Sequence, residues 1–285
     1  MLHILCVSRS PRFSPNSVDR DAAILAAVVT RLQRKGHEVF AIAEDLLESV
    51  DLSEFDLVCS MGRSTAALQL LHRAVSSRRL RVVNEPLALL RGTRQHLAEV
   101  FDAVQIPQPA YVPLHVGQPV APQLPEGFGF PLWIKRADAC AQHACDVQFV
   151  TDMPQAGAAL QSMADAGAVS VLAVQHVPGD LVKFYGVEGT GFFYCHYPTE
   201  SAGFSKFGLE RHNGAPQHYS YSQQALKEAA DLAASQTGFT VYGGDAVILP
   251  DGTFRIIDFN DWPSFSSCRR EAAKAIVERV LQLAE

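Results

Sequence analysis

The 285-residue sequence lacks any run of about 18 consecutive apolar residues, the length that a membrane-spanning helix needs. It also lacks a secretory leader, because its first residues run straight into strand-like sequence, and it has no repeat or low-complexity segment. Charged residues make up only 19% and the net charge is −6, which argues against a nucleic-acid-binding surface along the whole chain. We therefore expect a cytoplasmic protein that binds neither membranes nor nucleic acids.

The cysteines also lack any pairing pattern, since the six of them are scattered through mostly apolar stretches. We expect reduced thiols, as is usual inside cells. Apolar residues make up 48% of the chain, so a substantial core is expected and disorder is not. The length is sufficient for two or three lobes.

Strand and helix patterns alternate at the start of the chain. Apolar strand patterns cover residues 2–7, 37–43, 56–61 and 81–84, and helical periodicity separates them. This alternation predicts a small parallel α/β unit over residues 1–86. The loops 8–17 and 62–64 follow strands, so they are candidate substrate walls, although ordinary solvated connections would look the same.

Beyond residue 86 the pattern changes to a mixed one. We predict a helix over residues 87–104 and then a Pro- and Gly-rich linker, which together form a connecting region over 87–129. A central lobe over 130–178 and a C-terminal lobe over 179–285 follow, each with strands and a helix. The fold class is therefore α/β in the first unit and α+β in the rest.

A hairpin near the C-terminus carries paired acidic residues. If the loop holds the four residues 250–253, Leu249 pairs with Phe254 and Asp245 faces Asp258. Directly opposed carboxylates repel unless a cation lies between them, and Asn260 emerges on the same face as Asp258. Hard oxygen ligands of this kind suit Mg²⁺ carried by nucleotide phosphates. An odd loop would turn Asp258 to the other face, and a hairpin with merely acidic ends is the alternative.

Two lysines interrupt apolar strand patterns, Lys135 in Pro131–Arg136 and Lys183 in Leu181–Val187. A lysine anchored in this way can offer its ammonium to phosphate, or it can simply extend to water.

Taken in order, these motifs resemble the ATP-grasp superfamily over about residues 91–280. The resemblance rests on Arg94 before a helix that ends in Ile-Pro-Gln-Pro, on Pro131–Lys135, on Val174–Lys183, and on Gly244-Asp245 followed by Asp258-Phe-Asn-Asp-Trp-Pro. It implies an ATP-grasp fold preceded by a Rossmann-like pre-ATP-grasp domain.

The resemblance also implies roles for single residues. ATP and one or two Mg²⁺ ions would be held by Arg94 and Lys135 at the phosphates, Gln175, His176 and Val177 beside adenine, Asp180 at the ribose, and Asp245, Asp258 and Asn260 at the metal. Lys183 and Arg211 would act in catalysis. The loop 137–145 has none of the glycines usual in the family, and His143 could compensate by touching a phosphate.

The acceptor stays open at this point. Most ATP-grasp enzymes join a carboxylate to an amine or thiol through an acyl-phosphate, and we favour this reaction. The alternatives are a small-molecule kinase of the inositol polyphosphate kinase type and an inactive nucleotide-binding regulator. A small-molecule or peptide substrate would be held by Arg12, Arg63, Lys206 and Ser264. A homodimer is a further option.

Overall fold

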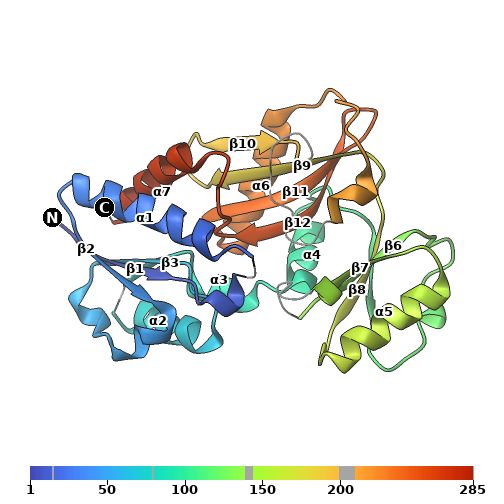
Figure 1. Cartoon of the computed structure of the whole chain (residues 1–285), viewed down its shortest axis with the longest axis horizontal. Coiled ribbons are helices and arrows are strands. Elements are labelled where there is room, and N and C mark those ends of the chain that lie inside the picture. The colour runs from blue at the N-terminus through green and yellow to red at the C-terminus, as the bar shows by residue number, and fades with distance from the viewer. Residues whose placement is uncertain (15, 79, 139–143, 199–208, 285) are drawn as a thin grey trace.

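The computed structural model describes the chain except for residues 15, 79, 139–143, 199–208 and 285, and it describes only the backbone of residues 78, 144, 210 and 211. Three four-stranded sheets form three lobes along the chain (Figure 1). Among the described residues, no helix combines the length and the apolarity that crossing a membrane would require.

The N-terminal sheet is parallel and has the order β2-β1-β3-β4. Side chains alternate across β1: Ile4 and Cys6 enter the core beneath α1, whereas Leu5 and Val7 enter the core on the α2 side. The parallel α/β unit predicted from the alternating pattern is therefore present. Its elements are β1 (His3–Ser8), η1 (Pro11–Phe13), α1 (Val18–Arg34), β2 (Glu38–Ala43), η2 (Glu44–Ser49), η3 (Leu52–Glu54), β3 (Leu57–Ser60), α2 (Thr65–Arg78) and β4 (Arg81–Val83).

The last helix, α7 (Arg269–Ala284), lies alongside α1 above this sheet (Figure 1). Its apolar face shares one core with α1, β1 and β3, and Trp262 and Phe265 belong to the same core. Asn84 adds a polar link, because its side-chain amide donates to the carbonyl of Val241 at 2.9 Å and accepts from its N–H at 2.7 Å. The packing of α7 on α1 and the hydrogen bonds of Asn84 thus join the first unit to the C-terminal lobe.

The connecting region differs from the prediction at two places. The single helix predicted over 87–104 is interrupted, giving α3 (Pro86–Arg91) and α4 (Arg94–Ala103). Gly92 packs so closely on Phe239 that a Cβ would lie 2.5 Å from its ring, and the Thr93 hydroxyl caps α4 by accepting from the N–H of His96. Part of the predicted linker is β5 (Tyr111–Leu114), which pairs with β8 and so belongs to the central lobe.

The central sheet is antiparallel with the order β5-β8-β6-β7, and α5 covers one face. The C-terminal sheet is antiparallel with the order β10-β9-β11-β12, and α6 and α4 pack on one of its faces. The remaining elements are η4 (Ala121–Gln123), β6 (Leu132–Arg136), η5 (Ala144–Asp146), β7 (Val147–Val150), α5 (Met153–Asp165), β8 (Val171–Gln175), β9 (Asp180–Val187), β10 (Phe193–His196), η6 (Leu209–Asn213), α6 (Gln223–Thr237), β11 (Val241–Ile248) and β12 (Phe254–Asp261).

Gly186 on β9 tests the packing of the C-terminal sheet. A Cβ there would lie 2.2 Å from the Tyr242 ring, which is fully buried, so Gly186→Ala should lower the free energy of unfolding by about 1–3 kcal/mol. Gly157→Ala is the control, because nothing lies within 4 Å of a Cβ in the middle of α5 and alanine favours a helix. Urea denaturation of both variants gives the comparison, and equal stability would contradict the packing described.

Candidate active site

One cleft of about 770 Å³ collects side chains from all three lobes. Its size is that of sites that hold ligands the size of a nucleotide. Of the residues predicted from sequence, Arg63, Arg94, Lys135, Lys183, Asp245, Asp258, Asn260 and Ser264 line it together. Residues that lie far apart along the chain therefore meet in one place.

In the hairpin β11–β12, Asp245 pairs with Asp258 as predicted, but the register of the strands near the turn differs from the predicted one. Ile248, not Leu249, pairs with Phe254, so the loop is odd and the predicted pairing at the turn is wrong. A β-bulge between Ala246 and Asp245 leaves Ile257 without a partner and restores the pairing of Asp245 with Asp258. Because of this extra residue, Ile256 and Phe259 both enter the core, while Asp258 turns to the cleft.

The bulge also fixes the first lysine. The carbonyl of Ile257 accepts a hydrogen bond from Lys135 Nζ at 2.9 Å. The pKa of Lys135 is lowered to about 8, mainly because burial disfavours the charged form; Asp258 and Asp245 oppose this shift and the positive charge of Arg94 adds to it. Arg94 itself donates to the carbonyl of Arg136 at 3.0 Å. Lys135 of the central lobe and Arg94 of α4 thus both place a positive charge near Asp258.

Asp258 holds its charge in this setting. Burial acts to raise its pKa, but the positive charges of Arg94 and Lys135 and a hydrogen bond from Asn260 outweigh burial, so the pKa lies below its ordinary value. Asn260 Nδ2 donates to Asp258 Oδ2 at 2.9 Å, and Arg94 Nε lies 3.9 Å from Asp258 Oδ1. The carboxylate side chain remains 30% exposed to the cleft, so a ligand can reach it.

A single row of side chains crosses the four strands at this level. His196 pairs with Lys183, Lys183 with Asp245, and Asp245 with Asp258. Directly paired residues point to the same face, so the whole row faces the cleft. Lys183 Nζ donates to Asp245 Oδ1 at 3.1 Å. Along the row, the Lys183 ammonium is therefore followed by two neighbouring carboxylates.

The N-terminal side of the cleft is built on buried ion pairs. Arg9 Nη1 lies 3.2 Å from Asp21, its Nη2 lies 3.5 Å from Asp261, and Arg63 pairs with Asp261 as well. Glu44 holds the two loops that follow β1 and β3, since its carboxylate accepts from the backbone N–H groups of Ser10, Arg63 and Ser64. Both loops line the cleft and are joined by one carboxylate, and their contact with a substrate stays a prediction.

Comparison with solved structures assigns the fold. A D-alanine–D-alanine ligase from Bacillus anthracis, solved with ATP, superposes with a TM-score of 0.67 at 11% identity over 100% of this chain and 99% of that one. A D-alanyl-alanine synthetase A from Vibrio cholerae gives 0.70 at 13% identity over 99% and 98%. A RimK-domain ATP-grasp protein from Sphaerobacter thermophilus gives 0.67 at 17% identity over 98% and 99%. This chain has the ATP-grasp fold. No protein-family model and no curated protein matches the sequence.

The segment predicted as the hinge beside adenine lies next to the cleft. Gln175, His176 and Val177 border a small hollow that shares Trp133 and Lys135 with the main cleft. Trp133 Nε1 donates to His176 Nδ1 at 3.2 Å, which holds the hinge against the central sheet. The structure places these residues, and their contact with adenine stays a prediction.

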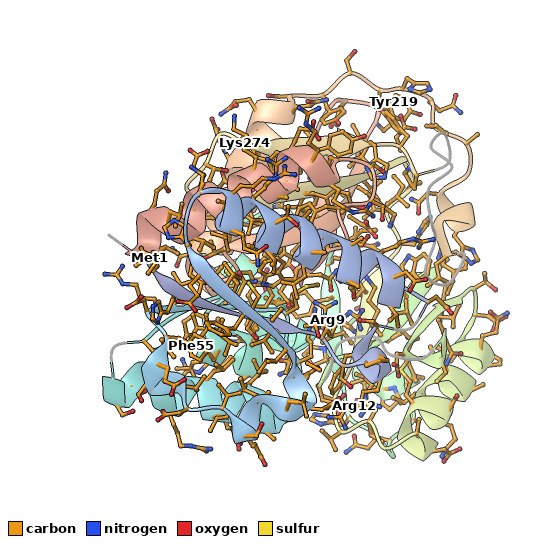
Figure 2. The ribbon with its side chains drawn as sticks, turned by 60° about the vertical axis from the view of Figure 1, so that its left-hand side comes forward. Met1, Arg9, Arg12, Phe55, Tyr219 and Lys274 are labelled. Atoms are coloured by element: carbon orange, nitrogen blue, oxygen red, sulfur yellow. The ribbon has the colours of Figure 1, made fainter. Side chains whose placement is uncertain are left out.

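Two predicted ligand residues lie outside the cleft. Asp180 lies three residues before Lys183 on β9, so the strand period turns it to the opposite face. Its buried carboxylate accepts from the backbone N–H groups of Gln217 at 2.7 Å and Tyr219 at 2.9 Å, so the ribose contact predicted for Asp180 has no support. Arg12 is 62% exposed beside Asp45, whereas Arg9 lies inside the molecule, as Figure 2 shows.

Three predicted residues cannot be placed. His143 and Lys206 lie outside the described residues, and so does the side chain of Arg211, whose backbone belongs to η6. Arg9, Asp261 and His196 also line the cleft and were not among the residues predicted from sequence. Asp261 directly follows the predicted metal ligand Asn260, and Arg9 lies in the predicted substrate loop 8–17. Their positions in the sequence could therefore have indicated both residues. His196 occupies no such position.

The proposed metal ligands are compatible with Mg²⁺ on nucleotide phosphates. The described residues contain no cluster of three or more His, Cys, Asp or Glu side chains that could hold a metal by themselves. Two carboxylates and one amide on adjacent strands are what Mg²⁺ uses when phosphates complete its shell. Asp245, Asp258 and Asn260 would hold the ion in that arrangement.

Lys135 makes stability depend on pH in a defined direction. Its pKa is about 8 in the folded chain against 10.5 otherwise, so the unfolded chain binds more protons between these values. The unmodified chain should therefore gain stability relative to Lys135→Met, on the order of 1–3 kcal/mol, as pH rises from about 7 to 10.5. Denaturant titrations without nucleotide measure this difference.

Lys274→Met is the matched control, because Lys274 is exposed on α7 (Figure 2). Its stability should follow that of the unmodified chain across the same pH range. A constant difference between the unmodified chain and Lys135→Met would show that the Lys135 ammonium is not desolvated.

Proposed function

We propose that the chain is a Mg²⁺- and ATP-dependent ligase that joins a carboxylate to an amine or thiol through an acyl-phosphate. The observation that carries this proposal is the pair Asp245 and Asp258, held opposite each other and surrounded by Lys183, Lys135 and Arg94. The ligases of similar fold, one of them solved with ATP, support the same reading.

The residues of the cleft divide the chemistry between them. Bound Mg²⁺ would supply positive charge at the phosphate oxygens. Lys135 and Arg94 approach from the central lobe and α4, and Lys183 approaches from β9, so the transferred phosphoryl group would be met by cations from more than one side. Positive charges fixed in this way stabilise the charge that develops during in-line transfer.

The N-terminal side of the cleft, which would hold the acceptor, carries charges that do not suit a polyphosphate. Arg9 and Arg63 both reach this end of the cleft, but they already neutralise Asp21 and Asp261. A highly phosphorylated acceptor would need a denser set of cations. Because these charges balance, this end of the cleft is unsuited to a polyphosphate, which counts against the kinase alternative.

Product analysis tests the reaction class. The chain is incubated with ATP, Mg²⁺ and a panel of D- and L-amino acids, dipeptides, thiols and polyols. The proposal predicts ADP, inorganic phosphate and a joined product. ADP with a phosphorylated acceptor would indicate the kinase alternative, and absence of ADP with every acceptor would indicate a nucleotide-binding regulator.

Asp258→Asn tests the metal site itself. Loss of one carboxylate charge should reduce ATP turnover by at least about 100-fold, while circular dichroism shows an intact fold. Asp251→Asn, in the exposed turn of the same hairpin, is the matched control and should retain turnover. Normal turnover by Asp258→Asn would show that the metal assignment is wrong.

A further inference from the structure

The row across the C-terminal sheet ends on a histidine that the nucleotide chemistry does not use. His196 closes β10 and pairs directly with Lys183, whose ammonium lies on Asp245. Adjacent strands lie about 4.8 Å apart, so His196 stands one strand beyond Lys183, roughly 10 Å from Asp245 and roughly 14 Å from Asp258. That spacing leaves room for one substrate group between the phosphoryl site and His196.

The imidazole lies in the cleft with its ring held in place. Its ring centroid is 5.6 Å from that of Tyr185 and 5.5 Å from that of Tyr194, so the two tyrosines flank it. Its Nδ1 is buried and has no hydrogen-bond partner among the described residues. The ring is therefore positioned by packing, and no hydrogen bond to a described residue occupies its buried nitrogen.

No other described group that lines the cleft is as well suited to accept a proton near neutral pH. Each carboxylate there is already engaged with a cationic partner. These pairs are Asp21 with Arg9, Asp138 with Arg136, Asp245 with Lys183, Asp258 with Arg94, and Asp261 with Arg63. Burial raises the pKa of Tyr185 to about 12, and Lys135 already donates to the carbonyl of Ile257.

An acceptor amine needs such a base. An α-amino group is mostly protonated at neutral pH, and even the neutral amine must lose a proton as it forms the new bond. Building on the ligase function proposed above, we propose that His196 is the general base that takes this proton from the attacking amine. The amine nitrogen bonds to the carbonyl carbon of the acyl-phosphate, one N–H proton passes to the imidazole, and the carbon–oxygen bond to phosphate breaks to release inorganic phosphate.

The electrostatics around the ring agree with this role. Burial lowers the pKa of His196, and the Lys183 charge lowers it further, so the imidazole is neutral and able to accept a proton. The groups that face it are Lys183 and Tyr185 from β9 and Tyr194 from its own strand, with Asp245 beyond Lys183 on β11.

Hydroxylamine separates this step from the rest of the reaction. It is largely unprotonated at neutral pH and traps an acyl-phosphate as a hydroxamate without the help of a base. A panel of D- and L-amino acids and dipeptides with ATP, Mg²⁺ and hydroxylamine identifies the carboxylate that the unmodified chain activates. The same carboxylate is then tested with an amino acid as the amine, and both products are measured for His196→Gln.

His196→Gln should reduce amide formation by about 100-fold or more while hydroxamate formation changes less than about threefold. Tyr194→Phe keeps the ring packing beside His196 and should leave both rates unchanged. An equal fall of amide and hydroxamate in His196→Gln, or no fall in amide, would overturn the role of His196 alone. If the unmodified chain forms no hydroxamate with any carboxylate, the proposed ligase function is wrong, and this role with it.

Discussion

The site depends on a single extra residue in β12. Ile257 has no partner on β11, and this bulge shifts the strand so that Ile256 and Phe259 fill the core while Asp258 and Asn260 face the cleft. The same residue gives its carbonyl to Lys135 and so ties the central lobe to the C-terminal one. An unbroken hairpin would put either the apolar residues or the carboxylate on the wrong face.

Charged side chains are arranged differently at the two ends of the cleft. Around Asp245 and Asp258, cations from several elements converge, as the proposed binding of a phosphate chain and Mg²⁺ requires. At the other end, Arg9 and Arg63 are balanced by buried carboxylates that also fasten the first lobe to the end of β12. The packing of α7 on α1 joins the first lobe to the C-terminal lobe.

Much of this arrangement could be predicted from sequence, for physical reasons that differ between residues. The pairing of Asp245 with Asp258 was predicted from an even loop and is present with an odd one, because a bulge leaves little trace in the spacing of apolar residues. Asp180 was misplaced although the strand period alone turns it away from Lys183. The break at Gly92 and the position of His196 depend on contacts with distant residues, Phe239 and Lys183, which no local pattern encodes.

The central claim is that the opposed carboxylates bind Mg²⁺ together with the phosphates of ATP. Isothermal titration calorimetry with a non-hydrolysable ATP analogue, in Mg²⁺ and then in EDTA, measures this directly. The account predicts that removing Mg²⁺ weakens binding at least about tenfold, or roughly 1.4 kcal/mol. Equal affinity in both conditions, or no binding in Mg²⁺, would contradict it.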